Sequence, residues 1–158
     1  MNRKDEHVSL AKAFHKPRLN DFDAVQIIHQ SFPEIDSAQV TLETELFGRS
    51  FATPFFINAM TGGSEKSKKI NQDLAEVAKA CDLMMATGSV SAALKDPALS
   101  DTFQVVRQVN PEGFLLANVG AGSSVENALR AIDLFEADAL QIHLNAPQEL
   151  VMPEGDRE

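Results

Sequence analysis

Four continuous apolar runs recur along the chain, and they constrain its fold more than any other feature. They cover residues 53–60, 83–87, 113–119 and 139–145. Their centres lie about 30 residues apart, which is the length of a β/α/β unit. Runs that are apolar throughout, rather than alternating, are typical of parallel strands buried on both faces. The pattern predicts four parallel strands in an α/β fold.

Segments with helical spacing separate these runs. Ile70, Leu74, Val77 and Ala78 fall on one face of residues 66–81. Shorter segments with the same property cover residues 103–109 and 124–136. A strand–helix succession therefore extends over residues 51–158, which we expect to form one structural unit.

Residues 1–50 follow a different pattern and are expected to be a separate arm and capping segment. Alternation over residues 40–45, followed by Gly48-Arg49-Ser50, predicts a hairpin that closes one end of the sheet or barrel. Helical periodicity is present over residues 22–28.

Composition excludes several classes of protein. The net charge is −9, which gives no bulk electrostatic reason to bind nucleic acid or anionic lipid. Cys81 is the single cysteine, so an intrachain disulfide is impossible, and it is expected to be a small buried apolar residue. No apolar run reaches the ~20 residues that span a bilayer, and the N-terminus lacks the apolar core of a secretory signal. These features predict a soluble cytoplasmic protein.

The carboxyl ends of the predicted strands carry small and polar residues, and ligands of parallel α/β folds bind at such ends. Each group also has a structural explanation as a turn or helix cap. No G-x-G-x-x-G motif supports a dinucleotide site. The candidates, in chain order, are Ala59, Met60, Thr61, Ser89, Ser91, Asn118, His143, Asn145, Gln148 and Glu149.

The fourth strand end holds the densest polar group. His143 and Asn145 are two residues apart, so an extended strand would point both to one face, with Leu144 on the opposite, helix-facing side. Glu149 offers a hard oxygen ligand that suits Mg²⁺ shared with a phosphate. A structural and a functional role are about equally supported for this group.

The N-terminal Arg3-Lys4 pair and His7 have two explanations. They are either a solvated terminus or an arm that folds over an anionic ligand, because Arg and Lys both bind phosphate.

Several motifs occur together in order, and as a set they are specific. They are Asn2-Arg3-Lys4-Asp5-Glu6-His7, Asn20-Asp21-Phe22-Asp23, Ile57-Asn58-Ala59-Met60-Thr61-Gly62-Gly63, His143-Leu144-Asn145 through Gln148-Glu149, and Pro153-Glu154-Gly155-Asp156. With them the chain resembles the N-terminal half of the type 2 isopentenyl-diphosphate delta-isomerases. These enzymes use FMN on a (β/α)8 TIM barrel.

The resemblance implies a function. Isopentenyl and dimethylallyl diphosphate would be interconverted by a 1,3 proton shift, in isoprenoid biosynthesis, with reduced FMN, Mg²⁺ and NADPH as reductant. It also implies homo-oligomers in the full-length family.

The resemblance also implies roles for individual residues. Arg3, Lys4, His7, Ser89, Ser91 and Gln148 would bind substrate. Ala59, Met60, Thr61, Ser89 and Asn118 would contact FMN. His143, Asn145 and Gln148 would be catalytic, and Glu149 would ligate Mg²⁺.

Two departures from the family bear on these expectations. Val90 and Ser91 stand where members often carry Gln or a basic residue. The family's barrel needs eight strands and this chain supplies four, so we expect a truncated or split form that needs its other half. The alternatives are another FMN-dependent TIM-barrel oxidoreductase and a non-catalytic half-barrel that acts through association.

Overall fold

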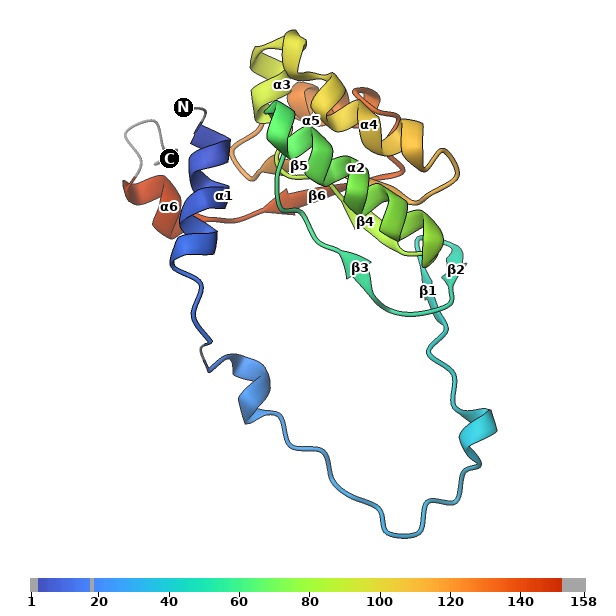
Figure 1. The fold of residues 1–158 in the computed structure, drawn as a ribbon. Helices are drawn as coiled ribbons and strands as arrows, with labels where there is room; N and C mark the ends of the chain where they lie inside the picture. Colours follow the sequence, from blue (N-terminus) through green and yellow to red (C-terminus); the bar gives the residue numbers. More distant parts are fainter. Residues whose placement is uncertain (1–2, 18, 152–158) are drawn as a thin grey trace.

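The computed structural model describes residues 3–17 and 19–151 of the chain, apart from the side chains of Arg3 and Gln148. Its centre is a sheet of four parallel strands in the order β3-β4-β5-β6 (Figure 1). The strands are β3 (Phe56–Ile57), β4 (Met84–Ala86), β5 (Leu115–Gly120) and β6 (Ala139–His143). Each falls in one of the four apolar runs, with β5 extending one residue beyond its run to Gly120, and β4 and β5 are buried almost throughout, as parallel central strands should be.

The expectation of a (β/α)8 TIM barrel is wrong for this structure. The described residues form an open sheet whose edges are β3 and β6, with a separate two-stranded antiparallel sheet beside it. The apolar runs predicted the number of strands in this sheet and their parallel direction. They carried no information on closure, because closure depends on pairing between the first and last strands rather than on any local pattern.

One face of the sheet is covered by helices. The three predicted helical segments are α2 (Glu65–Ala80), α4 (Asp101–Val109) and α5 (Val125–Asp133). Their apolar sides pack on Leu115, Ala117 and Val119 of β5 to form the main core. Helix α3 (Ser91–Lys95) and the 3-10 turn η3 (Pro97–Leu99) were not predicted, because five residues give too little periodicity.

A hairpin covers part of the other face, as predicted. Strands β1 (Thr44–Leu46) and β2 (Arg49–Phe51) pair antiparallel, and both Phe47 and Gly48 have positive φ. Positive φ at both central residues is the geometry of a type I′ turn. Phe51 is 3% exposed and meets Phe114, which precedes β5, edge to face. The hairpin therefore closes the end of the sheet at which the strands begin.

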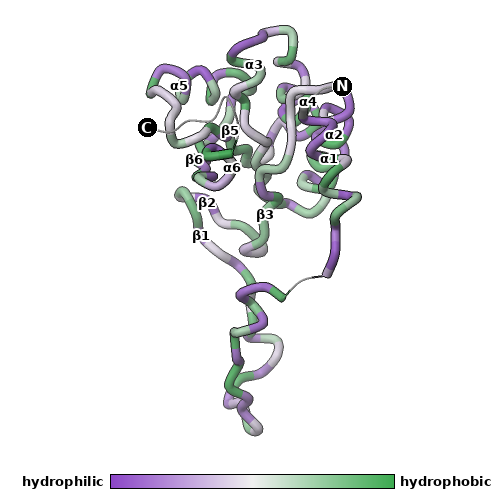
Figure 2. The backbone as a smooth tube through the Cα atoms, turned by 90° about the vertical axis from the view of Figure 1, so that its left-hand side faces the viewer, coloured by the Kyte–Doolittle hydropathy of each residue, from purple (hydrophilic) through white to green (hydrophobic). Residues whose placement is uncertain are grey.

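Residues 14–17 and 19–43 project away from the sheet (Figures 1 and 2). They hold two short 3-10 turns, η1 (Asp21–Ala24) and η2 (Ser37–Gln39), each with a capping box. The helix suggested by the periodicity over residues 22–28 is absent, since backbone after Ala24 is extended or irregular. Periodic apolar residues need a surface to pack on, and these side chains find none: Phe22 is 84% exposed and Ile28 also 84%.

Two further helices lie at the end of the sheet toward which the strands run (Figure 1). They are α1 (Arg3–Ala13) and α6 (Ala146–Val151). In the part of the chain that the structure describes, no helix combines the length and apolar character needed to cross a membrane. The expected burial of Cys81 is wrong, because this residue ends α2 and is exposed.

Candidate functional site

Backbone hydrogen bonds join the loops that follow the strands. The Gly88 N–H donates to the Thr61 carbonyl (2.9 Å), and the Val90 N–H donates to the Asn118 carbonyl (2.9 Å). The Ala121 N–H completes the series with the His143 carbonyl (3.1 Å). The residues predicted at the four strand ends thus lie together at the end of the sheet where the strands finish.

Two glycines set how closely these loops approach. A Cβ on Gly88 would lie 2.6–2.7 Å from backbone atoms of Thr61. A Cβ on Gly62 would lie 2.1 Å from the Phe103 ring in the main core. Both positions exclude any side chain, so the loop after β3 is pressed against the loop after β4 and against α4.

A row of polar side chains runs across the ends of the strands, on the sheet face opposite the helices. Asn58 Oδ1 accepts from Gln141 Nε2 (2.9 Å), and Gln141 Oε1 accepts from Asn118 Nδ2 (2.9 Å). Asn118 Oδ1 lies 2.8 Å from Nδ1 of His143. We call these four residues the amide row; it links β3, β5 and β6 through side chains alone.

The predicted residues after β4 and within β5 lie at this end of the sheet. Ser89 and Ser91 are half-buried, and their hydroxyls share a hydrogen bond of 2.9 Å. Asn118 is 2% exposed. Its amide already bonds at both ends, which leaves one Nδ2 hydrogen for a ligand.

Helix α1 docks beside the loop after β3. The Ser64 hydroxyl, which caps α2, donates to the Asp5 carboxylate (2.7 Å). Lys4 Cγ lies 3.9 Å from the position of a Cβ on Gly63, so the stem of this side chain lies beside the loop after β3. His7 is exposed on the same helix. Arg3 begins α1, but its side chain lies outside the described part.

The segment after β6 departs from the prediction. Leu144 is 86% exposed, so it does not face the helices as expected, because β6 ends at His143 and the extended alternation ends with it. Asn145 is exposed and precedes α6, its carbonyl accepting from the Glu149 N–H (3.0 Å). Gln148 lies within α6 with its side chain outside the described part, and Pro153-Glu154-Gly155-Asp156 lies outside it altogether.

Glu149 is half-buried in α6. Within residues 3–17 and 19–151, no three His, Cys, Asp or Glu side chains gather closely enough to hold a metal. A Mg²⁺ ion bound here would take one carboxylate and complete its coordination with water and phosphate oxygens, as Mg²⁺ commonly does.

Two members of the amide row, Asn58 and Gln141, were missed by reasoning from the sequence. Gln141 is two residues before His143 and therefore on the same strand face. A polar residue inside an apolar strand was the available signal.

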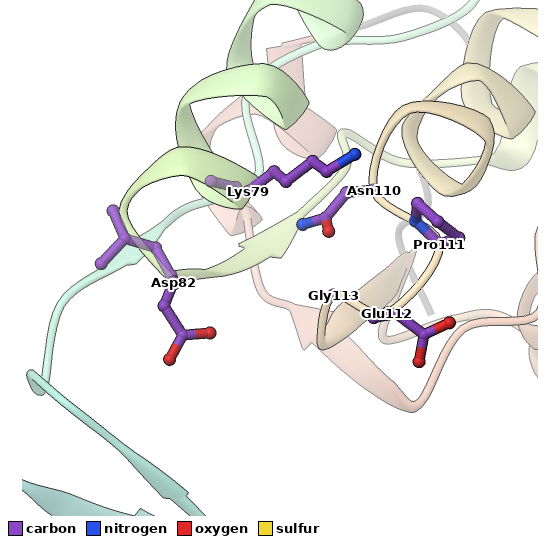
Figure 3. Close-up of a pocket in the computed structure, with 8 residues that line it drawn as sticks. Lys79, Asp82, Asn110, Pro111, Glu112 and Gly113 are labelled. Carbon is purple, nitrogen blue, oxygen red and sulfur yellow. The ribbon is translucent and has the colours of Figure 1, made fainter.

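A cavity of about 270 Å³ lies at the opposite end of the sheet, between the ends of α2 and α4 (Figure 3). Lys79, Asp82, Asn110 and Glu112 line it, with both charge signs present. Ligands of parallel α/β sheets bind where strands end, and this cavity lies where β4 and β5 begin. We therefore place the candidate site at the amide row and not in this cavity.

Two lysines on α2 have raised pKa values, away from the strand ends. The pKa of Lys68 is raised because its ammonium donates to Asp101 (2.6 Å), and that of Lys69 because it donates to Asp73. Both are surface ion pairs: the first joins α2 to α4, and the second lies within α2. They give no indication of a catalytic group.

Comparison with known proteins gives a consistent result. No protein-family model matches the chain. The chain is 54% identical over 158 residues to an isopentenyl-diphosphate delta-isomerase of Latilactobacillus sakei, and 50% identical over 156 residues to those of Staphylococcus aureus strains MSSA476 and MW2. Each match covers 99% of this chain and 45% of the relative. The chain is thus similar over nearly all its length to isopentenyl-diphosphate delta-isomerases and spans less than half of theirs.

Proposed function

We propose that the chain supplies the diphosphate-binding and proton-transfer part of a type 2 isopentenyl-diphosphate delta-isomerase. The observation that carries the proposal is the 54% identity with an isopentenyl-diphosphate delta-isomerase across all 158 residues. The reaction would be the 1,3 proton shift between isopentenyl and dimethylallyl diphosphate, in the cytoplasm, as a step of isoprenoid biosynthesis.

The residues at the strand ends fit FMN. Met60 is 77% exposed and Ala59 is small and half-buried, which offers an apolar surface for a flavin ring. The Ser89 hydroxyl and the remaining Nδ2 hydrogen of Asn118 would supply polar contacts. Reduced FMN, formed with NADPH, would provide the proton-transfer chemistry of the reaction.

The substrate diphosphate would be held from α1. Lys4 lies beside Gly63, and the Asp5–Ser64 hydrogen bond keeps α1 against the strand ends. Arg3, His7, Ser91 and Gln148 are the further candidates for substrate contacts. A protein of net charge −9 needs such local cations to bind a diphosphate, and Mg²⁺ on Glu149 would add to them.

His143 and Asn145 would face the reacting carbon chain. Within the described residues, His143 belongs to the amide row and Asn145 follows it at the start of α6. We assign His143, Asn145 and Gln148 to the proton-transfer region.

A second arrangement is favoured by the open edges of the sheet. Ile142 of β6 is 62% exposed and Phe56 of β3 is 44% exposed, which leaves apolar side chains at both edges. The relatives are more than twice as long, so function would also require residues that match the rest of their length. Homo-oligomers, as expected for the full-length family, would form from the completed protein.

Flavin titration and an isomerase assay test these arrangements. The purified chain is titrated with FMN, followed by fluorescence quenching, and then assayed with isopentenyl diphosphate, Mg²⁺ and reductant. Repeating both in the presence of the complementary segment of a relative separates the two arrangements. Absence of flavin binding and isomerisation in both preparations would contradict the proposal. Oxidation of a 2-hydroxy acid instead would indicate another FMN-dependent oxidoreductase.

A further inference from the structure

The direction of every hydrogen bond in the amide row is set by one backbone group. The Ala59 N–H donates to Asn58 Oδ1 (2.8 Å), and a backbone N–H can only donate. Oδ1 of Asn58 is therefore the acceptor in the side-chain contact with Gln141 as well. Gln141 must present its Nε2 to Asn58, which turns its Oε1 toward Asn118.

The same logic continues to His143. Since Gln141 Oε1 accepts, Asn118 must donate from Nδ2 and turn its Oδ1 toward the imidazole. Asn118 Oδ1 has no proton to give, so the contact of 2.8 Å requires a proton on Nδ1 of His143. In neutral imidazole one nitrogen carries the proton and the other a lone pair.

We infer that Asn58 and Gln141 are positioning residues that hold neutral His143 in the Nδ1–H tautomer, with the Nε2 lone pair directed to the ligand side of the strand ends. Nε2 lies beside Gly120, 3.6 Å from the position of a Cβ on that glycine. Gly120 is the last residue of β5 and places no side chain against this part of the ring.

The tautomer limits what the neutral imidazole can bind. An Nε2 lone pair accepts a hydrogen bond or a proton, and it repels the oxygens of a phosphate. Neutral His143 would therefore face the proton-transferring part of a substrate, while the diphosphate would lie toward the cations of α1. This last step rests on the proposed function; the tautomer itself follows from the hydrogen bonds alone.

Nitrogen NMR tests the tautomer directly. Long-range ¹H–¹⁵N spectra of the full 158-residue chain, with ¹⁵N-labelled histidine at about pH 8 where an ordinary imidazole is neutral, show which ring nitrogen carries the proton. His143→Gln identifies the His143 signals, and the exposed His7, His15 and His29 serve as references. We expect the Nδ1–H pattern for His143 by about fivefold over the other tautomer, the ratio that one ordinary hydrogen bond supplies.

Two substitutions of nearly equal size test the role of Gln141. Gln141→Leu removes both contacts, so the Asn118 amide is free to turn, and the Nδ1–H preference should fall toward that of the exposed histidines. Gln141→Glu still accepts from Asn118 Nδ2 and should retain the preference. Circular dichroism and thermal unfolding of both variants confirm that they are folded before the spectra are compared.

The tautomer inference and the proposed function can each be contradicted separately. An Nε2–H pattern in the unsubstituted chain would overturn the inference, and so would an Nδ1–H pattern that survives Gln141→Leu. Isomerase activity is measured separately. An Nδ1–H tautomer in a preparation without activity, with the complementary segment present, would contradict the proposed function and leave the inference intact. Isomerase activity in a chain whose His143 has the Nε2–H tautomer would support the proposed function and overturn the inference about the tautomer.

Discussion

Gly88→Ala should destabilise the chain far more than the loss of one glycine suggests. The new methyl group would lie 2.6–2.7 Å from the C, Cα and N atoms of Thr61, against about 3.5–4.0 Å for an ordinary carbon contact. The contact is with backbone, so no side-chain rotation relieves it. The loops after β3 and β4 must separate by about 1 Å, and this lengthens the hydrogen bond from Gly88 N–H to Thr61 O.

The expected cost combines two effects. Overpacking against a rigid neighbour costs about 1–3 kcal/mol, and here the upper end applies because the neighbour is backbone. The weakened hydrogen bond adds about 0.5–1 kcal/mol. We expect the free energy of unfolding to fall by about 3 kcal/mol, which moves a urea midpoint by roughly 1.5 M if m is about 2 kcal/mol/M.

Gly120→Ala is the matched control. Gly120 also stands at a strand end, but its added Cβ would meet the His143 ring at 3.6–3.7 Å, an ordinary contact. Urea unfolding of this variant should stay within about 0.5 kcal/mol of the parent or gain up to about 1 kcal/mol from the lower entropy of the unfolded chain. Equal midpoints for the two variants would refute the steric argument. Amide exchange at position 88 gives a second readout and should accelerate only in Gly88→Ala.

Three further results are expected. Arg107→Ala should lower the free energy of unfolding by about 2–4 kcal/mol in chemical unfolding, because the Arg107 guanidinium donates to Asp138 and to several backbone carbonyls. Arg130→Ala removes two contacts of 3.3 Å and should lower it by less than about 1 kcal/mol. Phe51→Ala should cost about 3 kcal/mol by leaving a cavity under the hairpin, measured by the same method. Glu149→Gln should weaken Mg²⁺ binding in the presence of isopentenyl diphosphate by more than about tenfold in calorimetry, with FMN binding unchanged; equal Mg²⁺ affinities would remove Glu149 from the metal site.

The sequence predicted those features of the fold that repeat or that depend on near neighbours. The strands, helices α2, α4 and α5, and the hairpin follow from apolar spacing and from the turn expected at Gly48-Arg49-Ser50, which the structure places one residue earlier, at Phe47-Gly48. Helix α1 has no such signal, because its residues are mostly polar and its position depends on the contact between Asp5 and Ser64, 59 residues apart. The assignment of the four strands to the first half of a TIM barrel was wrong for the same reason, since barrel formation is a property of distant strands.

In the candidate site, too, the residues that were predicted are those with a local sequence signal. Residues such as Thr61, Ser89 and Asn118 were predicted because they directly follow or end a strand, a local property. Gln141 lies inside β6, and a rule that looks only at strand ends passes over a polar residue within an apolar run.

The amide row explains why this strand tolerates a glutamine. A half-buried amide without partners would cost about 1–3 kcal/mol, but Gln141 uses its Nε2 and its Oε1, and both bonds lie on the face opposite the helices. On that face the hairpin covers the beginning of the strands and the polar row occupies their ends. On this face, therefore, the beginnings of the strands are apolar and contribute stability, while their ends, only a few residues further along, are polar. Exchanging Gln141 for Leu should therefore cost about 1–3 kcal/mol, because the buried Nδ2 of Asn118 loses its acceptor, and it also removes the group that orients Asn118.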